Sequence, residues 1–256
     1  MRIIRYLQQD GTPRYGWVLG DKVGPIEGDP YAAFHRAEAT IPLADLKLLP
    51  PALPSKIICV GRNYADHAKE LGNEVPEVPM LFLKPPSSLV AHGETIILPP
   101  QTQQPEHEAE LAIVIGKRGR WIEPDAVNEY ILGYTIANDI TARDLQKRDG
   151  QWTRGKGFDT FCPFGPWIET DFDPADAVVT CTVNGELRQM GSTRDMIFSV
   201  RQLLAYISSV MTLEPGDLIL TGTPAGVGPL KDGDELVTSI EGLGELRNPI
   251  AAEPVR

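Results

Sequence analysis

Short apolar runs that end within a few residues at glycine or proline recur along almost the whole chain. Examples are KIICVG, MLFLKP, ETIILPP and GDLILTG, and the 256 residues include 24 glycines and 23 prolines. A strand needs only about 4–8 residues, whereas a helix needs about ten or more, so this spacing of helix breakers favours strands. We therefore expect a mixed β (α+β) fold, mostly antiparallel, with few and short peripheral helices.

The N-terminal part of the chain predicts a small β-rich unit. RIIRYL and YGWVLG flank the turn-like segment QQDGTPR, as the two strands of a hairpin do. A short helix is expected over residues 30–37, and the proline-rich stretch LLPPALPS at residues 48–55 predicts a linker. The sequence thus indicates an N-terminal β-rich subdomain of residues 1–53 and a main domain of residues 54–256.

Two segments in the C-terminal half have the clearest local patterns. VVTCTV and ELRQ are joined by Asn184-Gly185, a pair suited to a type I′ hairpin turn. The segment SVRQLLAYISSVM predicts an amphipathic helix that Ser199 can cap. Its expected apolar stripe consists of Val200, Leu203, Leu204, Ile207, Val210 and Met211. By contrast, residues 150–165 are rich in glycine and aromatic residues and are expected to be irregular.

The charge of the chain narrows its possible partners. A net charge of −11 argues against nucleic acids and anionic membranes, but a local cation can still attract a small anionic substrate. No apolar run approaches the ~20 residues that span a bilayer, and the N-terminus lacks the pattern of a signal peptide. Cys59, Cys162 and Cys181 are odd in number and lack CxxC spacing, which argues against a disulfide framework or a zinc site. We expect a cytoplasmic protein.

The segment EHEAELAIVIG, residues 106–116, combines carboxylates with an apolar strand pattern. Glu106, Glu108 and Glu110 alternate along it, and alternate residues of a strand face the same side about 6.6 Å apart. One interpretation is a solvated sheet face. The other is a metal site, because a strand buried on both sides leaves carboxylates strongly destabilised unless they are paired or bound to a cation. This segment alone does not decide between the two.

Asp139 favours the metal site. It ends the apolar run YTIAND, where it could also simply cap the helix that begins at TARDLQKR. Together with Glu108 and Glu110 it would supply an all-oxygen ligand set. Such a set suits Mg²⁺, Mn²⁺ or Ca²⁺ rather than zinc.

The segment GRNYADHAKELG holds a second pair of interest. His67 and Glu70 are three residues apart, so on a helix they share a face. A glutamate hydrogen-bonded to a histidine orients the ring and raises its basicity, which would suit activation of water. Exposed pairs with this spacing are common, and in isolation that is the favoured interpretation. The loop that follows, NEVPEVP, is of a kind that can move as a lid.

Several further residues could contact an anion. Lys156 lies between glycines that would let a backbone approach a ligand closely, and Arg143 and Gln146 lie at the start of the TARDLQ helix. Each could equally be a surface residue. TGTPAGVG, at residues 221–228, resembles an anion-binding loop only loosely, because it lacks the Walker lysine and does not fit GxGxxG; a plain turn is the favoured interpretation.

In their order along the chain, these segments resemble the fumarylacetoacetate hydrolase family. The likeness covers roughly residues 52–250 and rests on GRNYADHAKEL, MLFLKP, EHEAELAIVIGK, NDITARDLQ, TRGKGFDTFCPFGP, VNGELRQMGSTRDMIF and LEPGDLILTGTPAGVGP. The branch it resembles comprises acylpyruvases, oxaloacetate decarboxylases and bacterial proteins named hydroxyheptadienedioate isomerases. The resemblance implies a β-roll core, a small N-terminal extra domain, a divalent metal and usually a homodimer.

The resemblance also assigns roles to residues. It implies that Mg²⁺ or Mn²⁺, or Ca²⁺ in a crystal, is bound by Glu108, Glu110 and Asp139. Glu106 lies outside this pattern. The water-activating pair falls on His67 and Glu70, and the groups that contact substrate fall on Arg143, Gln146, Lys156 and Thr223. Lys156 would also stabilise the negative charge of an enolate. The stretch between Gln146 and Trp152 is shorter than in mammalian acylpyruvases, which bears on substrate preference.

The activity implied is that of an enzyme acting on small anionic 2-oxo acids. The first expectation is hydrolysis of a C–C bond in an acylpyruvate-type (2,4-dioxo acid) substrate, in which a metal-held pyruvate enolate leaves. Decarboxylation of oxaloacetate uses the same enolate. The alternatives are isomerisation of 2-hydroxyhepta-2,4-diene-1,7-dioate and decarboxylation of 5-oxopent-3-ene-1,2,5-tricarboxylate in aromatic-acid catabolism. A more remote alternative is a non-catalytic binder of small acids, which would not need a base such as His67.

Overall fold

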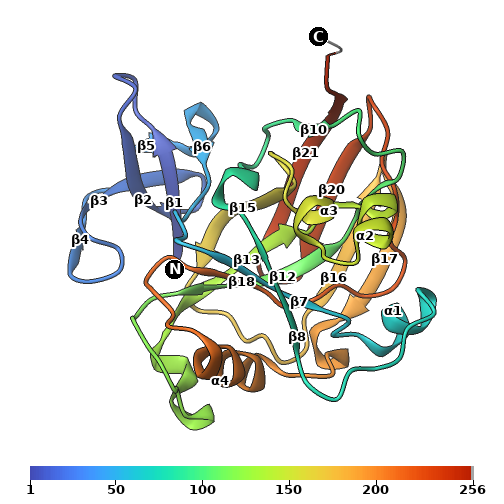
Figure 1. The fold of residues 1–256 in the computed structure, drawn as a ribbon. Coiled ribbons are helices and arrows are strands. Elements are labelled where there is room, and N and C mark those ends of the chain that lie inside the picture. Colours follow the sequence, from blue (N-terminus) through green and yellow to red (C-terminus); the bar gives the residue numbers. More distant parts are fainter. Residues whose placement is uncertain (255–256) are drawn as a thin grey trace.

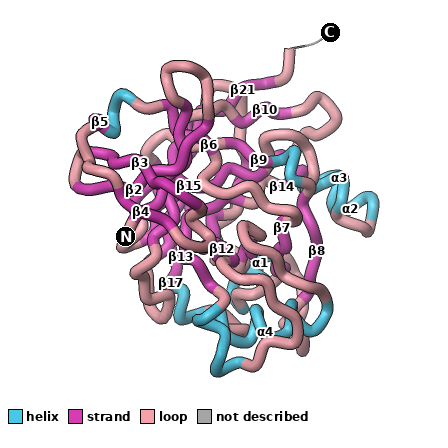
Figure 2. The backbone as a smooth tube through the Cα atoms, turned by 90° about the vertical axis from the view of Figure 1, so that its left-hand side faces the viewer, coloured by secondary structure: helices cyan, strands magenta, loops and turns pink. Residues whose placement is uncertain are grey.

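The computed structural model describes residues 1–254 and is dominated by β-sheet (Figure 1). Its strands form a 13-stranded, a 5-stranded and a 3-stranded sheet. Helices are few and short, as the cyan segments of Figure 2 show. The expected mixed, sheet-dominated fold is therefore confirmed. Among the described residues, no helix is both long enough and apolar enough to cross a membrane.

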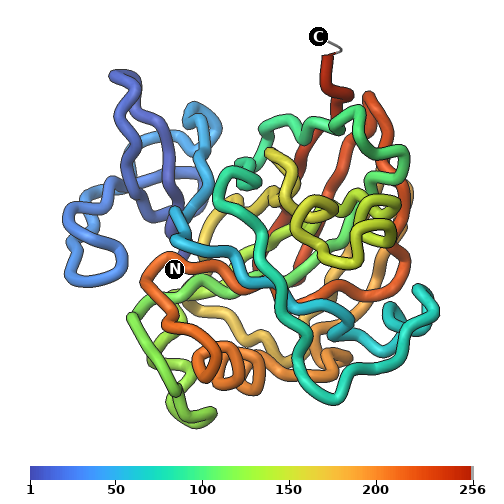
Figure 3. Tube along the Cα trace, viewed as in Figure 1, coloured from blue at the N-terminus to red at the C-terminus, as the bar shows by residue number. Residues whose placement is uncertain are grey.

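The N-terminal strands form one edge of the 13-stranded sheet and the blue lobe of Figure 3. They are β1 (Arg2–Leu7), β2 (Pro13–Leu19), β3 (Lys22–Gly28), β4 (Phe34–Arg36), β5 (Ile41–Pro42) and β6 (Lys47–Leu49). β1 pairs antiparallel with β15 (Cys162–Glu169), so the sheet continues from this lobe into the rest of the chain. The subdomain boundary at residue 53 stays a prediction.

The helix expected over residues 30–37 does not form, and that prediction was wrong. Asp29 makes a turn instead, because its side chain accepts the Tyr31 N–H at 2.9 Å. Phe34–Arg36 then pairs with β3 as a short strand. Backbone hydrogen bonds to an existing sheet edge outweigh the weak helix propensity of so short a segment.

The rest of the large sheet contains its most buried strands. In order they are β15, β13 (Ile131–Asn138), β12 (Ala109–Ile115), β18 (Leu218–Leu220) and β7 (Ile57–Gly61), and the partly exposed β8 (Met80–Lys84) ends the sheet. β12 is buried at every position. Leu111 and Ile113 join one apolar cluster, whereas Ala112 and Val114 join another on the opposite face. Burial of this segment on both sides, one of the two interpretations of its pattern, is therefore what the structure shows.

The second sheet contributes to the same core as Leu111 and Ile113. Its strands, in order, are β10 (Ile96–Leu98), β21 (Gly244–Ala252), β20 (Glu235–Ile240), β16 (Val178–Val183) and β17 (Glu186–Ser192). The β16–β17 hairpin turns at Asn184 and Gly185, whose φ angles are 53° and 78°. Both values are positive, as the predicted type I′ turn requires.

Helix α4 (Val200–Val210) confirms the amphipathic helix, with Ser199 as its N-cap in a capping box with Gln202. Val210 is 51% exposed, so its place in the apolar stripe was wrong: Met211, four residues after Ile207, packs against the core instead. The other helices are α1 (Ala65–Glu70), α2 (Arg143–Asp149) and α3 (Thr153–Lys156), with single-turn 3₁₀ segments η1 (Leu43–Asp45), η2 (Pro86–Ser88) and η4 (Thr193–Asp195) and the longer η3 (Pro124–Glu129). Residues 150–165 are thus not wholly irregular, since they contain α3 and the start of β15.

The smallest sheet frames the region of the carboxylates. It consists of β14 (Thr141–Ala142), β11 (Pro105–His107) and β19 (Gly228–Pro229), while β9 (Leu89–Val90) pairs with β15 elsewhere. β11 therefore leads directly into β12, and β14 follows β13. β11 pairs with β14, and β12 pairs with β13, so the β11–β12 and β13–β14 junctions lie beside each other. The carboxylates lie at these junctions.

Candidate active site

The three predicted metal ligands meet where two sheets adjoin. β11 and β12 belong to different sheets, and Glu108 is the single residue between them. Its N–H donates to Asn138 Oδ1 at 2.8 Å, and its carbonyl accepts the Asp139 N–H at 2.8 Å. Carboxylate oxygens of Glu108, Glu110 and Asp139, here called the acidic triad, lie within 4.8 Å of one another, and all three residues are buried. The EHEAE segment thus contains the end of β11 and the start of β12. Glu108 lies between these strands, where its backbone is hydrogen-bonded to Asp139.

Three cations surround two members of the acidic triad. Lys156 Nζ donates to Glu108 Oε2 at 2.8 Å and to Asp139 Oδ2 at 2.6 Å. Lys84 Nζ donates to Asp139 Oδ1 at 2.6 Å. Arg143 donates to Glu108 and, at 2.8 Å, to Glu106 Oε2. Glu106 is therefore a partner of Arg143 and not a member of the triad.

Glu110 differs from the rest of the triad because it has no cation. Its carboxylate accepts the Gly222 N–H at 2.6 Å, and within residues 1–254 it forms no ion pair. Burial and the carboxylates of Asp139 and Glu108 raise the pKa of Glu110 well above its usual value. The triad therefore lacks positive charge on one side, and its all-oxygen donor set fits a divalent cation.

Glu108 shows the opposite electrostatic balance. Burial alone would raise the pKa of its carboxyl group, but Lys156 and Arg143 outweigh burial and hold that pKa well below its usual value. In Lys156, burial opposes the charged form, and the carboxylates of Asp139 and Glu108 nevertheless raise its pKa. These groups are therefore held as ion pairs, and the unbalanced negative charge is concentrated at Glu110.

His67 lies in the wall of the same region. It is on α1, is 4% exposed, and its Nδ1 is 3.3 Å from Glu70 Oε2. Glu70 also accepts the Gly226 N–H at 3.0 Å. The interpretation as an exposed surface pair is therefore wrong for His67. A buried imidazole backed by a carboxylate is an arrangement suited to a general base.

The TGTPAGVG loop supplies backbone amides to the protein's own carboxylates. Gly222 donates to Glu110 and Gly226 donates to Glu70. Gly222 has a φ of 100°, and a Cβ there would lie 2.7 Å from Cβ of Asn63. Asn63 fixes the loop by donating to the Thr221 carbonyl at 2.7 Å. The loop is therefore not a plain turn, since it orients two carboxylates of the site.

A cavity of about 300 Å³ opens beside the acidic triad. Part of its wall is apolar and consists of Val60, Leu71, Phe82 and Trp152. Glu70 is the one predicted site residue outside the lining, and it contacts His67. The eight that line the cavity are His67, Glu108, Glu110, Asp139, Arg143, Gln146, Lys156 and Thr223.

The glycines around Lys156 serve backbone packing and not ligand approach. A Cβ at Gly155 would lie 2.9 Å from the Gln146 backbone nitrogen, so its small size lets α3 lie against α2. A Cβ at Gly157 would lie 2.5 Å from the Thr153 carbonyl oxygen, so glycine there lets the chain turn closely at the end of α3. The expectation that these glycines admit a ligand was therefore wrong, although Lys156 itself lies at the cavity.

The comparison with known families agrees with this geometry. Residues 56–251 match the family model described as fumarylacetoacetate (FAA) hydrolase, C-terminal. The chain belongs to the fumarylacetoacetate hydrolase family. Residues 1–51 match a separate model, described as Rv2993c-like, N-terminal. The family resemblance inferred from the motifs is thereby confirmed.

Relatives within the fumarylacetoacetate hydrolase family carry different activities. The chain is 45% identical over 222 residues to a mitochondrial oxaloacetate tautomerase of Rattus norvegicus, covering 82% of this chain and 71% of that protein. It matches the structure of 2-hydroxyhepta-2,4-diene-1,7-dioate isomerase from Mycobacterium marinum with a TM-score of 0.91, 44% identity and 100% coverage of both chains. For maleylpyruvate hydrolase from Sphingobium sp. SYK-6, the TM-score is 0.81 and the identity 34%, with coverage of 99% of this chain and 100% of that one. Family membership shows an enzyme fold but not which reaction this member catalyses.

The sequence interpretation missed Lys84, a further cation of this fumarylacetoacetate hydrolase-type site. It ends the apolar run MLFLK and is 1% exposed. The same signal, a charged residue closing a buried strand, had pointed to Asp139. The two residues form an ion pair, which brings the end of β8 to the residue that follows β13.

A second missed feature is a buried network that sets the direction of the Thr223 hydroxyl. The Ala109 N–H donates to Gln189 Oε1 at 3.1 Å, which identifies that atom as the oxygen. Gln189 Nε2 must then donate to Thr223 Oγ1 at 2.7 Å, and the Thr223 hydroxyl must donate to the Ala109 carbonyl at 2.8 Å. His107 Nδ1, 2.9 Å from Gln189 Oε1, must carry a hydrogen. Thr223 can therefore offer only an oxygen lone pair to the cavity.

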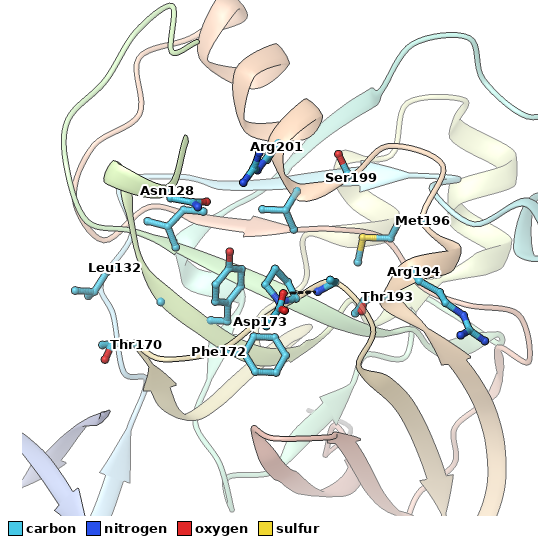
Figure 4. Close-up of a pocket in the computed structure, with 16 residues that line it drawn as sticks. Asn128, Leu132, Thr170, Phe172, Asp173, Thr193, Arg194, Met196, Ser199 and Arg201 are labelled. Carbon is cyan, nitrogen blue, oxygen red and sulfur yellow. Dashed lines mark hydrogen bonds between the residues drawn. The ribbon is translucent and has the colours of Figure 1, made fainter. Parts of the chain in front are cut away.

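A larger cavity elsewhere lacks this chemistry. It measures about 720 Å³ and lies among β13, the segment around Phe172, and the start of α4 (Figure 4). Of the 16 residues drawn there, Asp173 is the one carboxylate, and none belongs to the predicted site. The site is therefore identified by its convergent charged groups and not by the size of its cavity.

Proposed function

We propose that this chain is a divalent-metal-dependent enzyme that converts small anionic 2-oxo acids through an enolate. The observation that carries the proposal is the buried acidic triad, in which Glu110 has no cation, beside a cavity that His67 and Lys156 line. Mg²⁺ or Mn²⁺ on the triad would supply a Lewis acid for negative charge that develops on the substrate. The cavity of about 300 Å³ suits a substrate of four to six carbons better than a long one.

The protein's own side chains account for the remaining steps. Lys156 is held between Glu108 and Asp139, so its ammonium group lies at the place where a 2-oxo group would bind and can stabilise the enolate oxygen. His67, with Glu70 behind it, can take a proton from carbon 3 or from water. Phe82 and Trp152 reduce access of bulk water to the reacting atoms.

Keto–enol isomerisation of a small 2-oxo diacid is the first reaction we propose. It requires only that a proton leave carbon 3 and that a proton reach the 2-oxygen. One base, His67, and one group that stabilises the oxygen, Lys156, suffice for this. The 45% identity to an oxaloacetate tautomerase supports this reaction above the others.

Hydrolysis of an acylpyruvate is the second candidate, and the His67–Glu70 pair favours it. Here His67 would take a proton from water, and the hydroxide formed would attack the distal carbonyl carbon. The C3–C4 bond would break, its electron pair would form the pyruvate enolate, and a proton would return to carbon 3. Decarboxylation and dienedioate isomerisation pass through related enolates, and the Mycobacterium marinum isomerase is a relative of that kind.

Turnover of oxaloacetate and acetylpyruvate by the same preparation tests the proposal. Both have enol forms that absorb in the ultraviolet, so the rates can be followed with added Mn²⁺ and again with excess chelator. We expect the chelator to stop whichever reaction occurs. Fast enol–keto exchange of oxaloacetate with intact carbon chain would support isomerisation, whereas release of pyruvate and acetate from acetylpyruvate would support hydrolysis. Metal binding without turnover of either acid would refute the proposed function.

A further inference from the structure

Two cations in the lining of the active-site cavity are not bound to any carboxylate among residues 1–254. Arg62 and Lys147 both line the cavity, and within residues 1–254 neither side chain forms an ion pair or a hydrogen bond. Arg62 is half-buried and Lys147 is exposed. The other cations of the lining, Arg143 and Lys156, are already bound to carboxylates. Arg62 and Lys147 are therefore the positive groups that remain available to a ligand.

With a divalent cation bound, the charged groups around the acidic triad would have a net charge that one substrate carboxylate neutralises. The acidic triad and Glu106 provide four negative charges, and the three cations bound to them leave one negative charge over. A divalent cation would change this to one positive charge, which a single substrate carboxylate neutralises. A second carboxylate would find no countercharge there, and an uncompensated charge in a partly buried site is costly.

The structure holds Arg62 in a backbone conformation that it would otherwise avoid. Its φ is 58°, in the left-handed region that few residues other than glycine adopt. On one side, Gly61 leaves no room, since a Cβ there would lie 2.8 Å from the Trp152 ring. On the other side, the Asn63 side chain donates to the Thr221 carbonyl and accepts the Phe198 N–H at 2.8 Å. Strain of this kind is typical of residues that are positioned for a ligand.

Lys147 reaches the cavity from a different element. It is four residues after Arg143 on α2, so the two share one face of the helix. Its neighbour Arg148 is exposed, does not line the cavity and pairs with Asp149. Arg62 lies just before α1 and Lys147 lies on α2, so two different elements bring these side chains to the lining of one cavity.

We propose that Arg62 and Lys147 bind the second carboxylate of a 2-oxo diacid and thereby select dianionic over monoanionic substrates. The inference rests on the proposed function, because it takes the first carboxylate to be bound beside the acidic triad. A four-carbon diacid would use both ends of the cavity, with its short carbon chain against Phe82 and Trp152. A methyl-terminated acylpyruvate would leave the two cations unused.

Binding of malate and of 2-hydroxybutyrate to the Mn²⁺-loaded protein tests this selectivity without turnover. The two acids have the same four-carbon chain, and they differ only in that a methyl group replaces the distal carboxylate of malate. By calorimetry, we expect wild-type protein to bind malate about tenfold more tightly. Arg62→Gln should weaken malate binding by about tenfold and Lys147→Gln by about two- to fivefold, since the exposed lysine is more strongly screened by solvent.

Two controls accompany these variants. Neither substitution should change binding of 2-hydroxybutyrate by more than about twofold, because this acid lacks the group that the two cations would contact. Arg148→Gln removes the same charge from the same helix outside the cavity, and it should leave the affinity for both acids unchanged. Added salt should weaken malate binding in wild-type protein more than in the Arg62→Gln variant.

Specific outcomes would overturn the proposal. Equal weakening of both acids by Arg62→Gln would assign this side chain to the first carboxylate or to the structure of the loop. Unchanged malate affinity in both variants would also overturn it. If wild-type protein turned over oxaloacetate or acetylpyruvate but did not prefer malate, only the selectivity would fail. If it bound neither acid and turned over neither substrate, the proposed function itself would fail.

Discussion

Replacing Glu110 by glutamine should stabilise the metal-free protein and remove its stabilisation by Mn²⁺. Glu110 is buried, lies within 4.8 Å of two other carboxylates and has no cation. Glutamine keeps the shape of the side chain, and its oxygen can still accept the Gly222 N–H. Its amide group can donate to a neighbouring carboxylate, which Glu110 cannot do when ionised.

The magnitude follows from the spacing of the charges. Two like unit charges about 5 Å apart repel by ~3 kcal/mol at an effective dielectric constant of ~20. Lys156 offsets part of this repulsion, so we expect Glu110→Gln to raise the free energy of unfolding by ~1–3 kcal/mol. For a chain of this size, the Tm of the metal-free protein should rise by ~2–12 °C.

The stability that Glu110→Gln adds to the metal-free protein should increase with pH. Burial and the carboxylates of Asp139 and Glu108 raise the pKa of Glu110 in the folded protein, so the folded protein binds this proton more readily than the unfolded chain does. The cost of ionised Glu110 is full above the folded pKa and is relieved as pH falls toward the unfolded value of about 4.3. The advantage of Glu110→Gln should therefore be larger at about pH 8 than at about pH 5.5.

Glu108→Gln is a matched control, for which we expect the free energy of unfolding of the metal-free protein to fall and not to rise. Glu108 belongs to the same ligand set, but Lys156 and Arg143 hold its pKa low against the effect of burial. Its charge therefore contributes stability above its unfolded pKa, and this stability is lost as pH falls through the folded pKa. Removing the charge leaves two buried cations short of a partner, so the metal-free variant should lose ~3 kcal/mol.

Thermal unfolding after treatment with a chelator, and again with Mn²⁺ at about 100 times its Kd, measures both effects. Wild-type protein should gain ~2.7 kcal/mol from the metal, and neither variant should gain as much. Destabilisation of metal-free Glu110→Gln to the same extent as Glu108→Gln would refute the charge argument. A full Mn²⁺-dependent rise in Tm for Glu110→Gln would show that this residue is not a ligand.

Three further predictions concern the base, the lid and the buried network. His67→Ala should leave Mn²⁺ affinity unchanged and lower kcat by at least ~100-fold, because the base is lost while the acidic triad stays intact; calorimetry and turnover of one sample measure both. Residues 63–79 should exchange amide hydrogens more slowly when oxalate binds to the Mn²⁺-loaded protein, since the anion would bridge the triad and α1; mass spectrometry measures this. Gln189→Leu should lower the free energy of unfolding by ~2–4 kcal/mol in a denaturant titration, because it leaves His107 Nδ1 and the Ala109 N–H without their hydrogen-bond partner.

Each of these predictions has a contrary outcome. Full turnover by His67→Ala would remove the role of this residue as the base. Unchanged exchange over residues 63–79 would show that the segment does not close on the ligand. The control for Gln189→Leu is Leu187→Ala, because Leu187 is 54% exposed on the same strand and its removal should be nearly neutral. An equal loss of unfolding free energy in Gln189→Leu and Leu187→Ala would show that the hydrogen bonds of Gln189 add no stability of their own.

Local patterns predicted those elements whose partners lie close in the sequence. The Asn184-Gly185 turn and the Ser199 cap are made by neighbouring residues, so the sequence contains all the interactions that form them. The helix expected over residues 30–37 failed because the edge of β3 was available to pair with Phe34–Arg36. That competition is invisible in a short window of sequence.

The sequence motifs identified the residues that line the site, but they did not identify the residues that contact and orient them. The acidic triad, His67 and Lys156 were named from residue type and family resemblance, and they line one cavity. Lys84 and Gln189 were missed because their partners lie 55 and 34 residues away, at Asp139 and Thr223. The exposed-pair interpretation of His67 failed because tertiary packing buries the ring, and Glu70 beside it accepts a hydrogen bond from Gly226, 156 residues further along the chain.

The sequence by itself determined the residue types of this site, because the carboxylates, the histidine and the lysines are covalently present whatever the fold. It also determined a β-rich chain, through the short distances between helix breakers. Only the tertiary structure decided which carboxylates are paired with cations and which one is not. That difference between Glu108 and Glu110, two residues apart, arises because Lys156 and Arg143 reach Glu108 from α3 and α2, while the donor that reaches Glu110 in the described part of the chain is the Gly222 backbone amide.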